Sequence, residues 1–88
     1  MTAITLPARV TMAEARATLA QLQSQLRAAD DPVIDAASLQ ALDSSAVALL
    51  LACQREAQAR GKTIRLTGAP DKLGQLARLY GVAELIDL

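Results

Sequence analysis

The sequence predicts a single α/β domain in which helices pack on a small, mostly parallel β-sheet. The chain has 88 residues, of which 52% are hydrophobic, so one small core can form but not two. Short β-like runs alternate along it with longer stretches of helical periodicity. No linker, repeat or low-complexity segment interrupts the alternation, which is typical of parallel strands joined by helical crossovers.

The first part of the chain predicts a strand, a helix and a second strand. Residues 3–8, AITLPA, begin with a β-like run that Pro7 ends. Thr11 and Glu14 have the spacing of a capping box, so a helix should begin there. After a proline break, a short buried strand is expected over residues 33–36. The apolar stripe expected on the helix consists of Met12, Ala15, Leu19, Leu22 and Leu26.

The second part of the chain predicts two more helices with a strand between them. A helix is expected over 44–60, with Gly61 as its left-handed cap. Residues 62–68, KTIRLTG, alternate in polarity as a strand does. Residues 70–80 then predict a helix with Leu73, Leu76, Ala77 and Tyr80 on its apolar side. The last segment, 82–88, is interpreted as a short strand or a terminal turn.

The charge and hydropathy of the chain exclude two classes of partner. Nine Lys and Arg residues balance nine Asp and Glu residues, so no overall positive field exists to attract nucleic acid. The longest apolar run, 46–53, is far shorter than the roughly 20 residues that span a bilayer. We therefore expect no nucleic acid partner and no direct membrane insertion. A single Cys and no recognisable secretory signal predict a reducing, cytoplasmic location.

Catalysis is not expected. The chain has no His, and with Cys53 as its single cysteine it cannot assemble a Cys–His or Ser–His pair. The glycines are scattered, so no phosphate-binding loop forms, and no cofactor or metal is expected. Asp35 has no second carboxylate placed to share acid and base roles and is interpreted as structural. Cys53 is expected to pack as a small apolar residue, and Tyr80 to lie in the core with its hydroxyl at the rim.

The sequence Asp-Ser-Ser at residues 43–45 stands immediately before the longest apolar helix. Asp and Ser are favoured N-caps, because a side-chain oxygen accepts from an unpaired N–H of the first turn. A cap needs only one of these three residues. Two interpretations therefore stay open at this point, a plain helix cap and a small binding site centred on hydroxyl groups.

The helix that follows has two sides, as a rotation of about 100° per residue shows. One side should cover the sheet and consists of Ala46, Leu49, Leu50, Cys53 and Ala57. The other is a flank that holds Ser44, Val47, Ala48, Leu51 and Arg55. This flank packs on a neighbouring helix in one interpretation and forms a docking patch in the other.

Residues 33–88 resemble a STAS domain, the fold of bacterial anti-sigma factor antagonists. The matching features are a strand that contains Asp35, an Asp-Ser-Ser-small-aliphatic turn at 43–47, a long helix ended by Gly61, a strand, and a closing helix before Gly-Val. The ending DKLGQLARLYGVAELI is similar to the STAS subunits of phospholipid ABC transporters in Gram-negative bacteria. The chain departs from the family at Ala46, where Gly is usual.

The resemblance implies a non-enzymatic cytoplasmic subunit that binds the transporter ATPase. With the permease in the same complex, it would lie at the inner membrane and support transporter assembly or activity in outer-membrane lipid asymmetry. The expected partner-binding residues are Asp43, Ser44, Ser45, Ala46, Val47, Leu51 and Arg55. The alternative is an anti-sigma factor antagonist. In that branch of the family a serine kinase phosphorylates the position of Ser44, and the partner is an anti-sigma factor.

Overall fold

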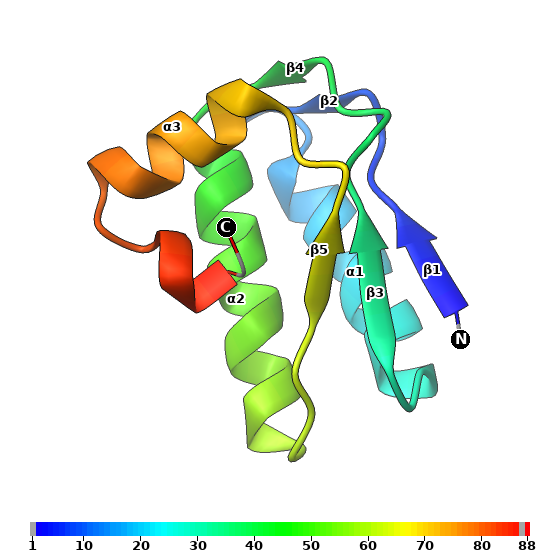
Figure 1. Cartoon of the computed structure of the whole chain (residues 1–88). Coiled ribbons are helices and arrows are strands. Elements are labelled where there is room, and N and C mark those ends of the chain that lie inside the picture. Colours follow the sequence, from blue (N-terminus) through cyan, green and yellow to red (C-terminus); the bar gives the residue numbers. More distant parts are fainter. Residues whose placement is uncertain (1, 87) are drawn as a thin grey trace.

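Three short parallel strands form the main sheet, in the order β1-β3-β5 (Figure 1). The computed structural model describes residues 2–86 and 88. Strand β1 (Thr2–Thr5) pairs with β3 (Pro32–Asp35), which pairs in turn with β5 (Arg65–Thr67). All of these pairings are parallel, so the predicted sheet type is confirmed.

Helices cover one face of this sheet. Helix α1 (Ala15–Ala28) and helix α2 (Ser44–Ala59) contact each other; in Figure 1, α1 lies behind the strands and α2 lies to the left of β5. Helix α3 (Asp71–Leu79) and the 3-10 helix η1 (Ala83–Ile86) both pack against α2. The predicted α/β class is therefore confirmed, with α2 at the centre of the helical layer.

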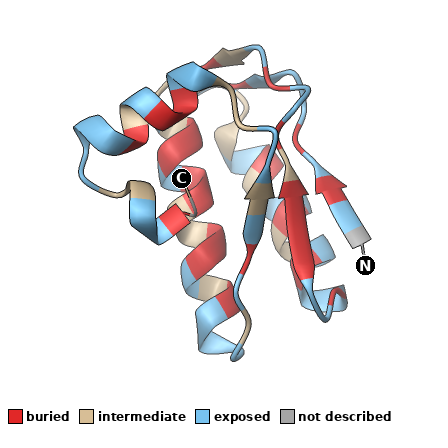
Figure 2. Cartoon of the chain, viewed as in Figure 1, coloured by how far each residue is buried: buried red, intermediate tan, exposed pale blue. Residues whose placement is uncertain are grey.

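The core lies between the sheet and the helices, where Figure 2 shows the buried residues. The helix stripes that the sequence predicts supply much of it, and each buried Leu or Ile contributes about 1.5–3 kcal/mol of transfer free energy. The sheet contributes Ile4 and Ile34, α1 contributes Leu22 and Leu26, and α2 contributes Leu49, Leu50 and Cys53.

A second, two-stranded parallel sheet was not predicted. It consists of β2 (Arg9–Val10) and β4 (Ala41–Leu42), and it lies just before the N-terminal ends of α1 and α2. Two residues are too few to show a strand period in a sequence. Val10 is fully buried and Leu42 is 5% exposed, so this small sheet joins the two segments that lead into α1 and α2.

The start of α1 confirms one half of the predicted capping box and differs in the other. The Glu14 carboxylate accepts from the Thr11 backbone N–H (2.9 Å), as a capping box requires, but it also accepts from the Thr11 hydroxyl (2.6 Å), so this hydroxyl donates to Glu14 instead of capping the helix. Residues 12–14 form a turn, and the regular helix begins at Ala15. Met12 is 81% exposed, so its assignment to the buried stripe is wrong.

The C-terminal part confirms α3 and corrects two details. Tyr80 is 53% exposed and not in the core, because it follows the last residue of α3 and lies outside its buried side. Of the two outcomes expected for residues 82–88, the described residues show a turn-like 3-10 helix and no strand. Asp87, in the same segment, lies outside the described residues.

Candidate docking site

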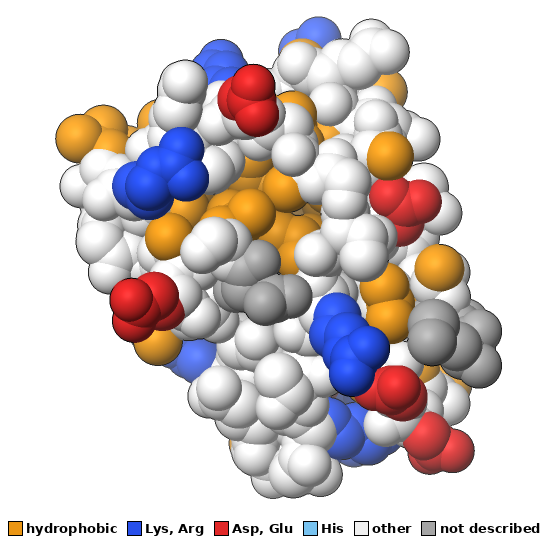
Figure 3. Space-filling model, in the orientation of Figure 1, with side chains coloured by type: hydrophobic (Ala, Val, Ile, Leu, Met, Phe, Trp, Pro, Cys, Tyr) orange, Lys and Arg blue, Asp and Glu red, His pale blue; other side chains and the backbone are white. Residues whose placement is uncertain are grey.

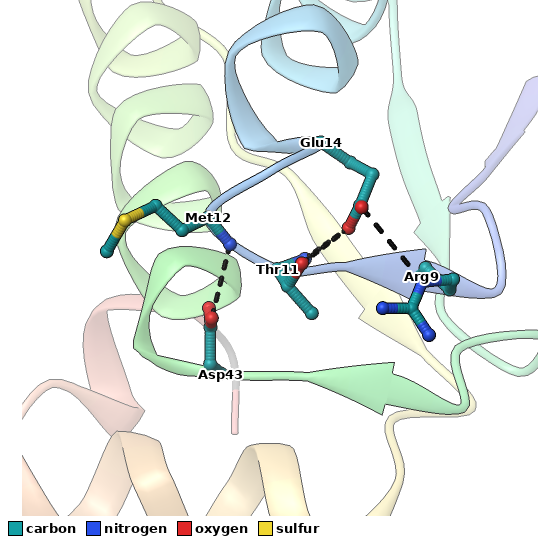
Figure 4. Close-up of polar contacts among 5 residues, drawn as sticks. All are labelled: Arg9, Thr11, Met12, Glu14 and Asp43. Carbon is teal, nitrogen blue, oxygen red and sulfur yellow. Dashed lines mark hydrogen bonds and ion pairs between the residues drawn. The ribbon is translucent and has the colours of Figure 1, made fainter.

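The N-terminus of α2 is held by the side chain of Asp43. One carboxylate oxygen accepts from the Ser45 N–H (2.8 Å) and the other from the Met12 N–H (3.1 Å), as Figure 4 shows for Met12. The Ser45 hydrogen bond lowers the pKa of the Asp43 carboxyl below its usual value. Asp43 therefore caps α2, and Ser44 is not required for the cap.

One side of α2 faces outward along its length. The residues on it are spaced by three or four positions, so they share one helix face. Ser44, Ala48 and Arg55 are exposed and Leu51 is half-buried. We call these four residues the α2 outer stripe. Its position agrees with the flank expected from helical phase.

An open cleft borders the α2 outer stripe on each side. The first, of about 280 Å³, lies between α1 and α2 and is lined by Ala15, Arg16, Leu19, Ser45, Ala48 and Leu49. The second, of about 220 Å³, lies between α2 and η1 and is lined by Leu51, Gln54, Arg55, Gln58, Val82 and Leu85. Apolar and polar side chains mix in both, a composition typical of protein interfaces.

Large apolar side chains are exposed in the regions around these clefts. Met12, in the turn before α1, is 81% exposed, and Leu85 of η1 is 57% exposed. Apolar side chains also reach the surface between α3 and β5 in Figure 3. Leu85 also lines the second cleft, so this cleft has an exposed apolar side chain at its border, as binding surfaces often do.

Two of the predicted partner-binding residues lie in the core. Ala46 is 1% exposed and Val47 is 3% exposed, so neither side chain is available at the surface. The prediction that Val47 lies on the open flank is wrong. Helix α3 packs against α2 (Figure 1), so the buried side of α2 is wider than helical phase alone predicts. The roles assigned to Asp43, Ser44, Ser45, Leu51 and Arg55 remain predictions.

Sequence reasoning missed the α1 wall of the first cleft. Ala15, Arg16 and Leu19 lie beside α2 because β2 pairs with β4 and Asp43 binds Met12. No local sequence signal predicts the contacts between these two segments, because they join residues about thirty positions apart.

The remaining candidates from the sequence have structural positions. One Asp35 carboxylate oxygen accepts from the Ala37 N–H (2.9 Å) in the turn after β3, which agrees with its structural interpretation. Cys53 is fully buried, and burial raises the pKa of its thiol to about 12. Within the described part of the chain, no group of three or more His, Cys, Asp or Glu residues is placed to hold a metal ion.

The parallel α/β fold and the Asp-capped α2 with adjacent serines define a domain of the STAS class. A protein-family model with the description "Mlab, STAS domain" matches residues 1–87, and the chain belongs to this family. A search of curated proteins found no match. STAS domains are generally non-enzymatic interaction domains. Among the described residues, no helix is both long enough and apolar enough to cross a membrane.

Proposed function

We propose that this protein is a MlaB-like accessory subunit that binds the ATPase of a phospholipid ABC transporter. In this role it supports the assembly or activity of the transporter in outer-membrane lipid asymmetry. It lies in the cytoplasm, held at the inner membrane through the complex of ATPase and permease. The description of the matching family supports this proposal, and ATP belongs to the partner.

The observation that carries the proposal is the α2 outer stripe between two clefts. Ala48 and Leu51 offer small and apolar contact surface, while the clefts can accept apolar side chains from a partner. Ser44 lies at the N-terminal end of this stripe and Arg55 toward its other end, which suits a polar rim around an apolar centre. A rigid helix face of this kind fits a folded protein surface better than a small substrate.

A second candidate function rests on Ser44 itself. Its side chain is exposed, and Asp43 supplies the cap, so a kinase can reach the hydroxyl without competing with the fold. A phosphate there would also meet the positive end of α2. These features support the second candidate, an anti-sigma factor antagonist that is switched by serine phosphorylation.

The test measures binding of the chain to the purified transporter ATPase by calorimetry. Ser44→Asp should keep the fold by circular dichroism but lose about two orders of magnitude in affinity, because the new charge is desolvated without a partner. Ser44→Ala should keep its affinity. Ala48→Arg should block binding, whereas Ala59→Arg, also exposed but at the far end of α2, should not.

A second experiment, recovery of partners from native extract, separates the two candidates. Tagged protein should recover an ABC ATPase. Recovery of only a serine kinase and an anti-sigma factor would assign the protein to the antagonist branch. Unchanged ATPase affinity in both folded variants, Ser44→Asp and Ala48→Arg, would remove the α2 outer stripe from the interface.

A further inference from the structure

The main sheet has two outer edges, and the edge at β5 is protected. Just before this strand, the Ile64 carbonyl accepts from the Gln54 side-chain amide (3.3 Å), and the Ile64 N–H donates to the Gln54 side-chain oxygen (3.0 Å). The exposed Arg65 adds a charge to the strand. Covered backbone groups and charged side chains are devices that keep a sheet edge from pairing with another chain.

Among the described residues, the edge at β1 shows no such protection. The Leu6 N–H donates to the Asp35 carbonyl (2.9 Å), and in a parallel ladder alternate residues face the same neighbour. Ala3 and Thr5 therefore direct their backbone N–H and C=O groups away from β3. Both residues are exposed, and β1 contains no charged residue and no proline. This edge is open to a further strand.

Space for a further strand exists beside β1. A cleft of about 440 Å³ lies along it, lined by Ala3, Ile4, Thr5, Gln25 and Ala28. The flank of α1 that borders this cleft is uncharged as well. Its exposed residues are Ala17, Gln21, Ser24, Gln25 and Ala28. We call β1 and this flank of α1 the β1 edge surface.

We infer that the β1 edge surface is the interface of a homodimer in which β1 pairs antiparallel with β1 of a second copy. The twofold axis passes between the two Ile4 residues. Ala3 then lies opposite Thr5 of the second copy, and the two exchange N–H···O=C hydrogen bonds on each side of the axis. The Ile4 side chains face the helices, beside the clefts at Gln25 and Ala28.

Charge favours a second copy in this orientation. Two copies of an uncharged surface meet without like-charge repulsion, whereas a partner strand with charged side chains would find no opposite charge on it. Asp30 and Asp31 lead into β3 beside the start of β1. Antiparallel pairing places the two acidic ends far apart, while parallel pairing would bring them together.

The dimer is compatible with partner binding. In Figure 1, β1 lies on the side of the domain away from α3 and η1. The cleft between α2 and η1 is therefore remote from the dimer axis. The inference concerns a different surface from the proposed ATPase contact, so either can fail without the other.

The test is analytical ultracentrifugation of the 88-residue chain from about 10 µM to about 1 mM, a range that covers weak self-association. We expect a reversible dimer. Ala3→Lys with Thr5→Lys places like charges opposite each other and should lower the association constant at least about tenfold. Ala3→Lys with Thr5→Glu places Lys opposite Glu in the proposed register and should keep the dimer. Thr67→Lys, on the protected β5, is the matched control and should dimerise like the wild type.

Amide hydrogen exchange of the wild-type chain is an independent test of the proposed dimer. Protection of the Ala3 and Thr5 N–H groups should rise with the fraction of dimer, because only these N–H groups of the edge change partners. A chain that stays monomeric over the whole range overturns the inference. A dimer that tolerates Ala3→Lys with Thr5→Lys, or exchange at Ala3 and Thr5 that does not depend on concentration, also overturns it.

Discussion

The Asp43 carboxylate accepts a hydrogen bond from the backbone N–H of Met12, 31 residues earlier in the chain, at 3.1 Å. Its other oxygen accepts from the Ser45 N–H at 2.8 Å. One side chain thus joins the start of the turn before α1 to the start of α2. The first cleft of the candidate docking site lies between these helices, so its shape depends on this residue.

Replacement of Asp43 should separate the cap from the link to Met12. Asp43→Ala removes both hydrogen bonds and should lower the melting temperature by about 5 °C. Asp43→Asn keeps one acceptor oxygen and should melt between Asp43→Ala and the wild type. Exchange of the Met12 and Ser45 amides should accelerate in Asp43→Ala. Identical melting of all three proteins would show that neither hydrogen bond contributes to stability.

Gln54 provides a second link between elements, from α2 to the segment that enters β5. It is 8% exposed, and its amide pairs with both backbone groups of Ile64. Gln54→Leu leaves these buried groups without partners and should lower the free energy of unfolding by about 3 kcal/mol. Gln58→Leu, one turn along and exposed, should change it by less than about 0.5 kcal/mol. Urea denaturation of the two variants measures the difference.

The main sheet, the three helices and the cap of α2 could be predicted because each rests on local signals. Helical period and the Asp-Ser-Ser sequence are read within a few residues. Val47 and Gln54 could not be placed, because both lie on a side of α2 that is buried by elements distant in sequence. The β2–β4 pairing and the α1 wall of the first cleft depend on such contacts too. The outward position of Ser44 and Arg55 followed from helical phase alone.

Two glycines with positive φ should differ in their tolerance of a side chain. At Gly68 (φ +66°), an added Cβ would lie 2.9 Å from the Cβ of Ala37. At Gly61 (φ +75°), nothing lies within 4 Å. Gly61→Ala should therefore cost about 1 kcal/mol for its backbone conformation alone, and Gly68→Ala about 2–3 kcal/mol because Ala37 must also move. Equal destabilisation of Gly61→Ala and Gly68→Ala in urea denaturation would mean that the loop at Ala37 moves without a measurable cost in free energy.

The turn before α1 should be sensitive to acid through Glu14. Hydrogen bonds from the Thr11 hydroxyl and backbone N–H lower the pKa of the Glu14 carboxyl below the ordinary value of 4.5. A carboxyl with a lowered pKa in the folded state stabilises the fold above the unfolded pKa, and this stabilisation is lost as the pH falls through the folded pKa.

Glu14→Gln should therefore be less stable than the wild type at pH 7, and the difference should shrink as the pH falls below about 4.5. Thr11→Val removes the hydroxyl donor but keeps the N–H, so the pKa of Glu14 should be lowered less, and the loss of stability on acidification should be smaller than in the wild type and complete at a higher pH. Urea denaturation across this range measures both effects. A difference between the wild type and Glu14→Gln that is the same at pH 7 and pH 3 would show that the ionised Glu14 does not stabilise the turn.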